Sequence, residues 1–221
     1  MSQKRIFSES EGDAWYLRNR DHLQSVSDLK FRSDIDLVCS ELGPHQADIN
    51  AVLEVGCSNG LKLEYVCRQL NAKGKGIEPS QRAVEEGNAR IADKKIELSV
   101  GSSESISFAG GQFDLVIFGF CMMFCDRDKV LQSLGEGDRV LRPGGFLVIT
   151  DWDAGPPRKN PFIHKPGIFS FKQDYSTILL ATSAYHLVAK RSYSHDNDFF
   201  DIDPNERVAT WILYKRPDVL D

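Results

Sequence analysis

The residues best suited to chemistry lie in one short stretch, Glu54-Val55-Gly56-Cys57-Ser58-Asn59-Gly60, which follows an apolar segment. Glycine tolerates positive φ and lets another molecule approach the backbone closely. The first amides of a helix have no partner inside that helix and attract polar or anionic groups. A strand, a glycine loop and a helix start at this place would therefore hold the polar end of a nucleotide-like molecule.

The same loop has a second interpretation, because Asn59-Gly60 between apolar segments is also typical of a hairpin turn. The apolar residues that follow decide between the two. Leu63, Val66, Cys67 and Leu70 repeat at a spacing of about 3.6 rather than 2. The pattern favours a helix over residues 61–70.

A second strand, Lys75-Gly76-Ile77-Glu78, ends in a carboxylate 18 positions beyond Gly60, and Pro79-Ser80 then opens another helix. Acidic residues at this spacing accept hydrogen bonds from both hydroxyls of a ribose in dinucleotide-binding folds. Alone, Glu78 would be interpreted as an exposed charge at the end of a strand. The glycine loop before it favours the ribose.

Length and charge limit the classes of protein to consider. A chain of 221 residues suits one well-buried core with appended segments. The formal net charge is −5, and the Lys and Arg residues are scattered among acids rather than gathered in the basic stripe that nucleic acid requires. We expect no nucleic-acid partner and a small or medium-sized molecule instead.

The five cysteines form no C-x-x-C pair, and no histidine pair has zinc-finger spacing. We expect reduced, mostly buried thiols and no metal site. The first residues are polar and lack the apolar core of a signal peptide, and the longest apolar run, Leu115 to Cys125, is far shorter than a membrane span. The sequence predicts a soluble, cytoplasmic protein.

Strand and helix patterns alternate along the middle of the chain. We expect helices at 33–42, 61–70, 80–92 and 128–141, and strands at 51–55, 73–78, 96–100, 113–118 and 145–150. Such alternation is typical of parallel strands with helices on both faces. In open sheets of this kind the ligand lies beyond the carboxyl ends of the strands. The loops after Val55, Ile77, Val100 and Ile117 share that edge.

The two ends of the chain have a different character. Residues 1–45 are expected to form a helical cap or lid, and residues 46–221 the main domain. Within that domain, residues 151–185 are expected to be an insertion that covers a substrate, with an ordered loop or lid at 151–172 and a short helix at 174–182. Alternating strands at 186–193 and 208–214 predict an antiparallel hairpin that closes the sheet.

Together these motifs resemble those of the class I S-adenosylmethionine-dependent methyltransferases, of the type 11/12 kind. The glycine loop resembles the family's first motif, with Ser58 in place of the usual middle glycine. Phe113-Asp114-Leu115-Val116 resembles the fourth-strand motif, and the run from Arg139 to Ile149 the helix-turn-strand before the fifth strand. The resemblance covers Ala51 to Thr150, which is 100 of 221 residues. It implies an α/β, Rossmann-like fold with a mostly parallel seven-stranded sheet.

The resemblance also implies a set of cofactor-binding residues. Those around the methionine part are Glu54, Gly56, Cys57, Ser58 and Gly60; those at the ribose are Glu78, Pro79 and Ser80; those at the adenine are Ser102, Ser103 and Glu104; and those near the sulfonium are Phe118, Gly119 and Phe120. Ser102 replaces the aspartate that the family usually places at the adenine amino group. A hydroxyl can accept the same hydrogen bond, more weakly than a carboxylate.

The N-terminal segment offers two further candidates. Trp15 and Arg18 would belong to a helix that folds over the cofactor, with Arg18 paired to the cofactor's carboxylate. The alternative is a solvated helix with Trp15 packed on the domain.

The proton acceptor for methyl transfer must come from outside the conserved motifs of the family. Met123-Phe124 stands where many relatives carry a histidine pair, and neither side chain takes a proton. The catalytic candidates are His164, Asp151 and Tyr175. His164 is the first choice for a base, since it lies in the expected lid and imidazole titrates near neutrality. Asp151 and Tyr175 could orient the acceptor, and His195 is interpreted as a surface residue at a strand end.

The expected function is methyl transfer from S-adenosylmethionine to a small-molecule or glycan acceptor, by a monomer or homodimer. The sugar class is suggested by residues 11–15 and 172–176, which are similar to uncharacterised bacterial methyltransferases associated with cell-surface sugar pathways. Two alternatives stay open. One is a non-catalytic partner protein that binds the cofactor. The other is an NAD-dependent oxidoreductase, whose G-x-G-x-x-G loop fits these residues poorly.

Overall fold

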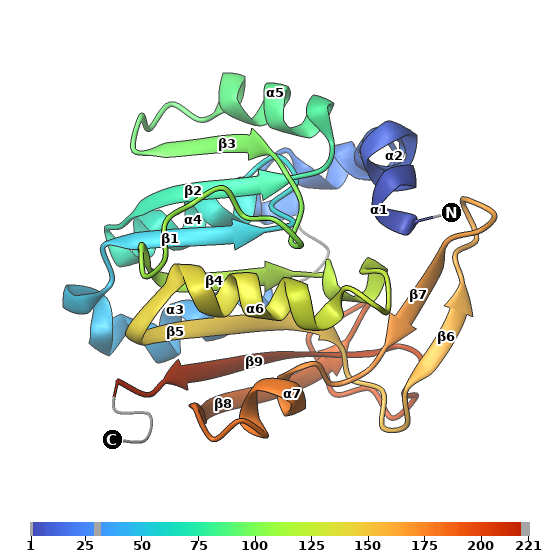
Figure 1. Ribbon diagram of the computed structural model, residues 1–221. Coiled ribbons are helices and arrows are strands. Elements are labelled where there is room, and N and C mark those ends of the chain that lie inside the picture. Colours follow the sequence, from blue (N-terminus) through green and yellow to red (C-terminus); the bar gives the residue numbers. More distant parts are fainter. Residues whose placement is uncertain (1, 29–31, 218–221) are drawn as a thin grey trace.

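A seven-stranded sheet forms the centre of the computed structural model, which describes residues 2–28 and 32–217 (Figure 1). The strand order is β3-β2-β1-β4-β5-β9-β8. The strands are β1 (Ala51–Val55), β2 (Lys73–Glu78), β3 (Ile96–Val100), β4 (Phe113–Gly119), β5 (Leu141–Trp152), β8 (Tyr185–Ser194) and β9 (Arg207–Lys215). The first five in this order are parallel, and β9 runs antiparallel to both neighbours. The predicted fold class is confirmed.

Helices cover both faces of the sheet. The α-helices within the described residues are α1 (Gln3–Ile6), α2 (Gly12–Asn19), α3 (Ser33–Leu42), α4 (Leu61–Leu70), α5 (Gln81–Arg90), α6 (Val130–Val140) and α7 (Ser176–Leu180), of which α3 to α7 cover the sheet. Apolar residues of α3, α4 and α5 pack on one face, and those of α6 and α7 pack on the other. In β1, Val52 belongs to the core beneath α3, α4 and α5, and Leu53 belongs to the core beneath α6 and α7. This central strand is therefore buried on both sides, as is typical of parallel sheets.

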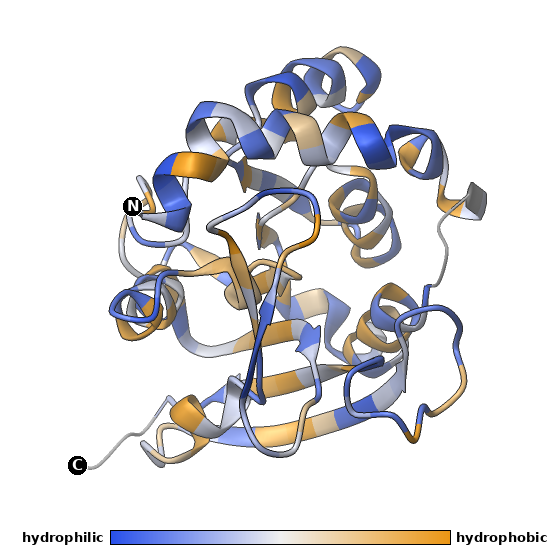
Figure 2. Ribbon diagram, turned by 90° about the vertical axis from the view of Figure 1, so that its right-hand side faces the viewer, coloured by the Kyte–Doolittle hydropathy of each residue, from blue (hydrophilic) through white to orange (hydrophobic). Residues whose placement is uncertain are grey.

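The strand order reverses between β1 and β4, and this reversal defines one edge of the molecule. Val55 is level with Ile77 of β2 and with Phe118 of β4, so the three strands end together. We call this the carboxyl edge. Figure 2 looks onto it: hydrophobic residues gather on the strands, and hydrophilic ones alternate with them along the outer helices.

Residues 151–172 differ from the expected loop. They contain a small antiparallel hairpin of β6 (Arg158–Pro161) and β7 (Phe169–Lys172). The first of these strands is Arg-Lys-Asn-Pro, whose composition predicts no strand, because its pairing depends on a partner that follows in the chain. The hairpin lies at the carboxyl edge beside the N-terminal helices (Figure 1).

The N-terminal segment is tied to several loops of this edge. Its two helices are joined by a π-helical turn at Phe7–Glu11. Asp13 accepts hydrogen bonds from the Ser80 hydroxyl at 2.6 Å and the Arg82 amide at 3.1 Å, at the start of α5. Gln3 contacts both the Phe124 carbonyl and the Phe169 amide. These contacts join the segment to the main domain and to the β6–β7 hairpin.

All five cysteines are free thiols, and Cys57, Cys67 and Cys125 are buried. Within residues 2–28 and 32–217, no helix has the length and apolar character needed to cross a bilayer.

Gly12 allows α2 to lie directly on the start of α5. A Cβ atom there would lie 2.8 Å from the Phe7 carbonyl oxygen and 3.2 Å from the Ser80 amide nitrogen. We expect Gly12→Ala to lower the free energy of unfolding by about 1–3 kcal/mol, because backbone must move to admit the methyl group. Urea denaturation measures this.

The matched control is Gly135→Ala in α6, where a Cβ atom would have no neighbour within 4 Å. That substitution should stabilise the protein by about 0.5–1 kcal/mol, since alanine is the better helix former. Equal effects of the two substitutions would contradict the close packing at Gly12.

Candidate functional site

The glycine loop has the backbone that its sequence predicts. Gly56 and Gly60 have φ of +78° and +72°, and Gly60 precedes α4 as its N-cap. The helix that follows excludes the hairpin interpretation. The amides of Gly56 and Cys57 donate to the Ile77 carbonyl at 2.8 and 3.2 Å, which holds the loop against β2. A Cβ atom at Gly56 would lie 2.8 Å from Cys121 Cβ, so the loops after β1 and β4 are in contact.

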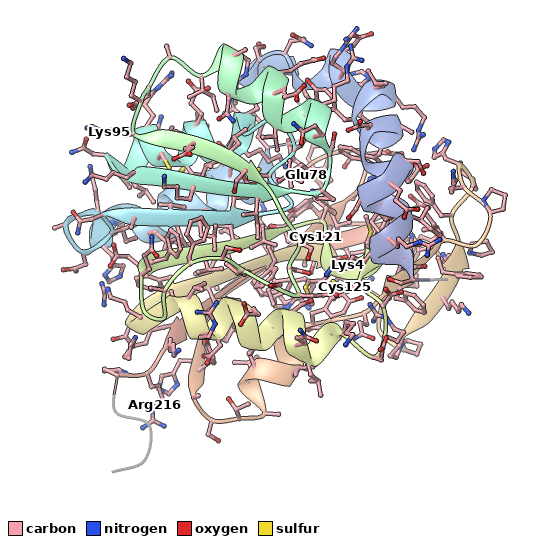
Figure 3. The ribbon with its side chains drawn as sticks, turned by 45° about the horizontal axis from the view of Figure 1, so that its top comes forward. Lys4, Glu78, Lys95, Cys121, Cys125 and Arg216 are labelled. Carbon is pink, nitrogen blue, oxygen red and sulfur yellow. The ribbon has the colours of Figure 1, made fainter. Side chains whose placement is uncertain are left out.

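Glu78 connects the glycine loop to the next helix. One carboxylate oxygen accepts the Ser58 amide at 3.0 Å, and the other accepts the Ser80 amide at 3.1 Å. Burial raises the pKa of this carboxyl to about 7, although both amides favour the charged form. Figure 3 shows Glu78 at the end of β2 next to the N-terminal helices. Pro79 follows it, and Ser80 is the N-cap of α5.

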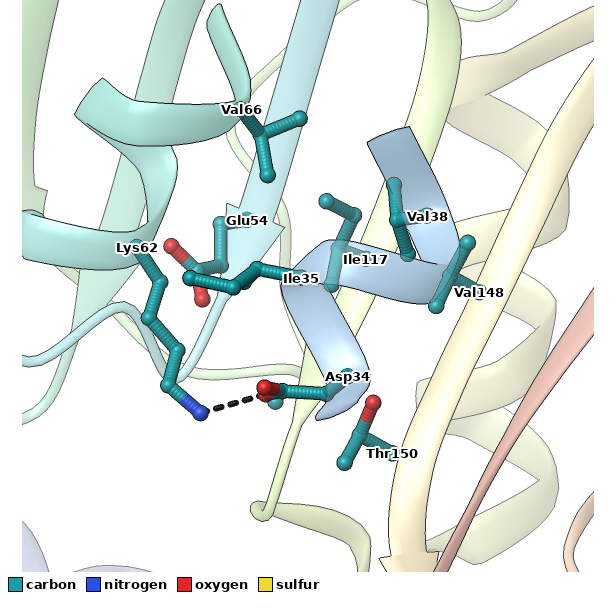
Figure 4. A pocket seen from close by; sticks show the side chains of 10 residues that line it. Asp34, Ile35, Val38, Glu54, Lys62, Val66, Ile117, Val148 and Thr150 are labelled. Atoms are coloured by element: carbon teal, nitrogen blue, oxygen red, sulfur yellow. Dashed lines mark hydrogen bonds and ion pairs between the residues drawn. The ribbon is translucent and has the colours of Figure 1, made fainter. Parts of the chain in front are cut away.

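Glu54 lines a small cavity with room for about one water molecule (Figure 4). The cavity is lined by Asp34, Ile35, Val38, Glu54, Lys62, Val66, Ile117, Gly119, Val148 and Thr150. Glu54 is 4% exposed, and burial raises its pKa to about 8. The Lys62 ammonium donates to Asp34.

Four buried polar atoms near the glycine loop have no hydrogen-bond partner within the described residues. They are Glu54 Oε2, Asp34 Oδ1, the hydroxyl of Ser58 and Arg90 Nε. Because an unpaired buried polar group is costly, such atoms indicate a place where a ligand or water completes the hydrogen bonding. Glycine backbone, a strand-end carboxylate and unpaired acceptors together fit the polar parts of S-adenosylmethionine.

Sequence reasoning missed Asp34 and Lys62. Each looks like a solvated helix charge in the sequence, and only the packing of α3 against α4 brings them to Glu54.

The residues expected at the adenine contact other parts of the protein. The Ser103 hydroxyl lies 2.9 Å from that of Ser133 in α6. Glu104 forms an ion pair with Lys4 of the N-terminal helix at 3.2 Å. The Ser102 carbonyl accepts the Ser105 amide at 3.3 Å. Their role at the adenine stays a prediction.

The end of β4 faces the glycine loop. Phe118 is fully buried in the core, and a Cβ atom at Gly119 would lie 3.2 Å from Glu54 Oε1. Phe120 has φ of +51°, which is uncommon for a bulky residue, and its amide donates to the Thr150 carbonyl. Its ring centroid is 5.7 Å from the Lys62 ammonium.

Trp15 and Arg18 lie on α2. Trp15 is half-buried, and Arg18 donates to Glu11, which is 2% exposed. The structure thus gives the guanidinium a partner inside the N-terminal segment. Its predicted pairing with a cofactor carboxylate is untested.

Two of the three catalytic candidates, Asp151 and Tyr175, are close enough to interact electrostatically, whereas His164 lies apart in an exposed turn. Asp151 is fully buried and accepts the Met123 and Trp152 amides at 3.0 and 2.8 Å, and burial raises its pKa to about 7. The hydroxyl of Tyr175, also fully buried, donates to the Phe171 carbonyl, and burial raises its pKa. His164 is exposed in the turn between β6 and β7, where its ring contacts Phe162.

Within the described part of the chain, no group of three or more His, Cys, Asp or Glu side chains is arranged to hold a metal ion.

The buried carboxyls make stability depend on pH. Glu54, Glu78 and Asp151 have pKa values raised from about 4 to about 8, 7 and 7. As pH rises from 4 to 8, the unfolded chain releases these protons before the folded chain does, so stability falls. We expect Glu54→Gln to remove part of this fall. Between pH 5 and pH 8, the free energy of unfolding of the variant should rise relative to that of the parent by on the order of a few kcal/mol.

Urea denaturation at pH 5, 6, 7 and 8 measures the difference. Glu97→Gln is the control, since Glu97 is an exposed carboxylate on β3. A difference for Glu54→Gln that stays constant with pH would contradict the raised pKa.

Comparisons with known proteins agree with this geometry. Residues 53–149 match the family described as a methyltransferase domain. The chain is 30% identical over 105 residues to methyltransferase GfsG of Streptomyces halstedii, covering 45% of this chain and 37% of that protein. It is 30% identical over 128 residues to a fatty-acid O-methyltransferase of Mycolicibacterium smegmatis, covering 58% and 46%. The matches span about a third to a half of these curated relatives' length.

A solved structure resembles the whole architecture. It is the Burkholderia thailandensis 1,6-didemethyltoxoflavin-N1-methyltransferase with bound 1,6-didemethyltoxoflavin and S-adenosylhomocysteine, with a TM-score of 0.69 and 13% identity, covering 92% of this chain and 87% of that one. The family match over residues 53–149, the sheet order and the glycine loop confirm the predicted resemblance to the class I methyltransferases, whose cofactor is S-adenosylmethionine.

Proposed function

We propose that this protein transfers a methyl group from S-adenosylmethionine to a small or medium-sized acceptor. One observation carries the proposal: the glycine loop and the Glu78 carboxylate lie together at the carboxyl edge of a domain that matches the methyltransferase family. Ligands of open α/β sheets bind at this edge, at the reversal of strand order.

In this proposal the chain's own residues bind and orient. Gly56 and Gly60 give a ligand access to the backbone, Glu78 accepts from the ribose hydroxyls, and Ser58 and Glu54 offer the buried polar atoms described above. When bound, the cofactor supplies a methyl group already activated by a positive sulfur. The protein must hold the nucleophile in line and exclude water, and positioning of this kind contributes about 7–11 kcal/mol in favourable cases.

The N-terminal segment and residues 151–185 are proposed to enclose the acceptor. Aromatic contacts support this, because Phe7 packs on Phe124 at 4.8 Å between ring centroids, and Phe124 packs on Phe162 of the hairpin turn at 5.2 Å. The two segments therefore meet over the loop that follows β4.

The finer proposal for the acceptor is a sugar or glycan intermediate, methylated in the cytoplasm by a monomer or homodimer. It rests on the sequence resemblance of residues 11–15 and 172–176. The relatives' names point to varied acceptors, among them a fatty acid and 1,6-didemethyltoxoflavin.

Calorimetry with S-adenosylhomocysteine, S-adenosylmethionine and NAD tests the proposal. We expect both adenosyl sulfur compounds to bind and NAD to give no heat. Glu78→Gln should weaken S-adenosylhomocysteine binding by about 10- to 100-fold, because hydrogen bonds to a charged group contribute about 1.5–3 kcal/mol. Glu97→Gln should bind as the parent does. Absence of binding by either adenosyl compound would refute the proposal.

A second measurement separates an enzyme from a non-catalytic binding protein, which the departures from the family pattern at Ser102 and at Met123-Phe124 leave open. Purified protein is incubated with S-adenosylmethionine and a panel of sugars, phenols, amines and fatty acids. Formation of S-adenosylhomocysteine with a panel member is expected. Cofactor binding without turnover on any member would favour the binding protein.

A further inference from the structure

We propose that His195 is the base that takes the proton from the acceptor, in a site walled by His195, Trp152 and Phe120 that receives a hydroxyl-bearing ring with an apolar face. The inference rests on the proposed methyl transfer. It names the base that this reaction needs and the chemical class of the molecule that receives the methyl group.

Three rings meet at the carboxyl edge. Trp152 ends β5, and His195 directly follows β8. Their rings are nearly parallel, with centroids 5.0 Å apart and planes at 21°. Phe120, directly after β4, presents a T-shaped contact to His195 at 6.4 Å. The Trp152 ring is itself covered by the imidazole and by the Lys172 ammonium, so a flat apolar face would meet the rings of His195 and Phe120, with Trp152 behind the imidazole.

Contacts with neighbouring residues hold Trp152 and His195 in place. Trp152 is 8% exposed, its indole N–H donates to the Met123 sulfur at 2.7 Å, and the Lys172 ammonium lies 3.1 Å from its ring centroid. The His195 amide donates to the Glu206 carbonyl at 2.7 Å. The imidazole is therefore positioned by its own backbone and by a buried, hydrogen-bonded indole.

His195 is also open to a ligand. Its side chain is 40% exposed, whereas Asp151 and Tyr175 are fully buried and bonded to the backbone. Phe120 follows Gly119 in the chain, and its ring contacts the Lys62 ammonium. Gly119 and Lys62 both line the cavity at Glu54, beside the glycine loop. The imidazole thus lies on the same edge as the proposed cofactor residues.

Charged groups of both signs lie near this imidazole and the two rings beside it. The Asp196 carboxylate is 3.6 Å from Nδ1, and the Lys62 and Lys172 ammonium groups lie at the Phe120 and Trp152 rings. Imidazole suits the role because it gains and loses a proton near neutral pH.

The step balances in atoms and charge. A lone pair on the acceptor oxygen forms the new bond to the methyl carbon while the electrons of the carbon–sulfur bond stay on sulfur. The imidazole takes the hydroxyl proton, so the positive charge lost by sulfur is carried by His195.

Steady-state kinetics of the parent and of His195→Gln test the proposal. S-adenosylmethionine is supplied with one of two probes, 4-nitrophenol or methyl α-L-rhamnopyranoside, which distinguish a phenol from a sugar ring. We expect turnover of one probe. The substitution should lower kcat by about 100-fold or more and flatten the pH–rate profile between pH 5 and 8, with little change in KM. His186→Gln is the matched control, since His186 is exposed near the other end of β8.

A second readout needs no turnover. With S-adenosylhomocysteine present, the probe should shift the NMR signal of the His195 imidazole and leave that of His186 unchanged. Circular dichroism checks that both variants fold.

This inference is overturned if His164→Gln loses turnover while His195→Gln keeps it. It is also overturned if neither probe is methylated and neither probe shifts the NMR signal of His195. Binding of S-adenosylhomocysteine in that case leaves the proposed methyl transfer standing, whereas absence of that binding refutes both.

Discussion

The carboxylate of Glu78 is the interaction on which the candidate site depends. It bridges the Ser58 amide of the glycine loop and the Ser80 amide at the start of α5. A charged acceptor between two backbone amides is a strong, directional constraint, and burial strengthens it while raising the energy of the charge. Because the loop, β2 and α5 all meet at this group, a ligand that hydrogen-bonds to it contacts the junction of three elements.

A second layer of structure closes over that junction. Asp13 caps α5 from α2, and Asn59 of the glycine loop donates to the Leu23 carbonyl. The N-terminal segment therefore depends on the same backbone as the glycine loop. Its ties to the β6–β7 hairpin through Gln3 make the two appended segments a connected cover.

The carboxylates near the site serve two purposes. Asp151 is fully buried and anchors the turn after β4 through backbone amides, which is a structural task. Glu54 keeps an unpaired oxygen, and the Asp34–Lys62 pair lines the same cavity. Burial of such charged groups lowers the stability of the folded protein, and functional sites commonly contain groups of this kind.

The sequence by itself determined the order of strands and helices, the glycine loop and the place of Glu78. Helical and strand periodicities, glycine positions and strand-end charges are local signals, and they predicted the β1–α4–β2 unit almost to the residue. Tertiary structure alone decided the rest. The Arg158–Pro161 strand exists because it pairs with β7, and Asp34 reaches Glu54 because α3 packs on α4. His195 and Trp152 stack because β8 and β5 flank β9, and residues so far apart in the chain become neighbours only when the sheet has formed.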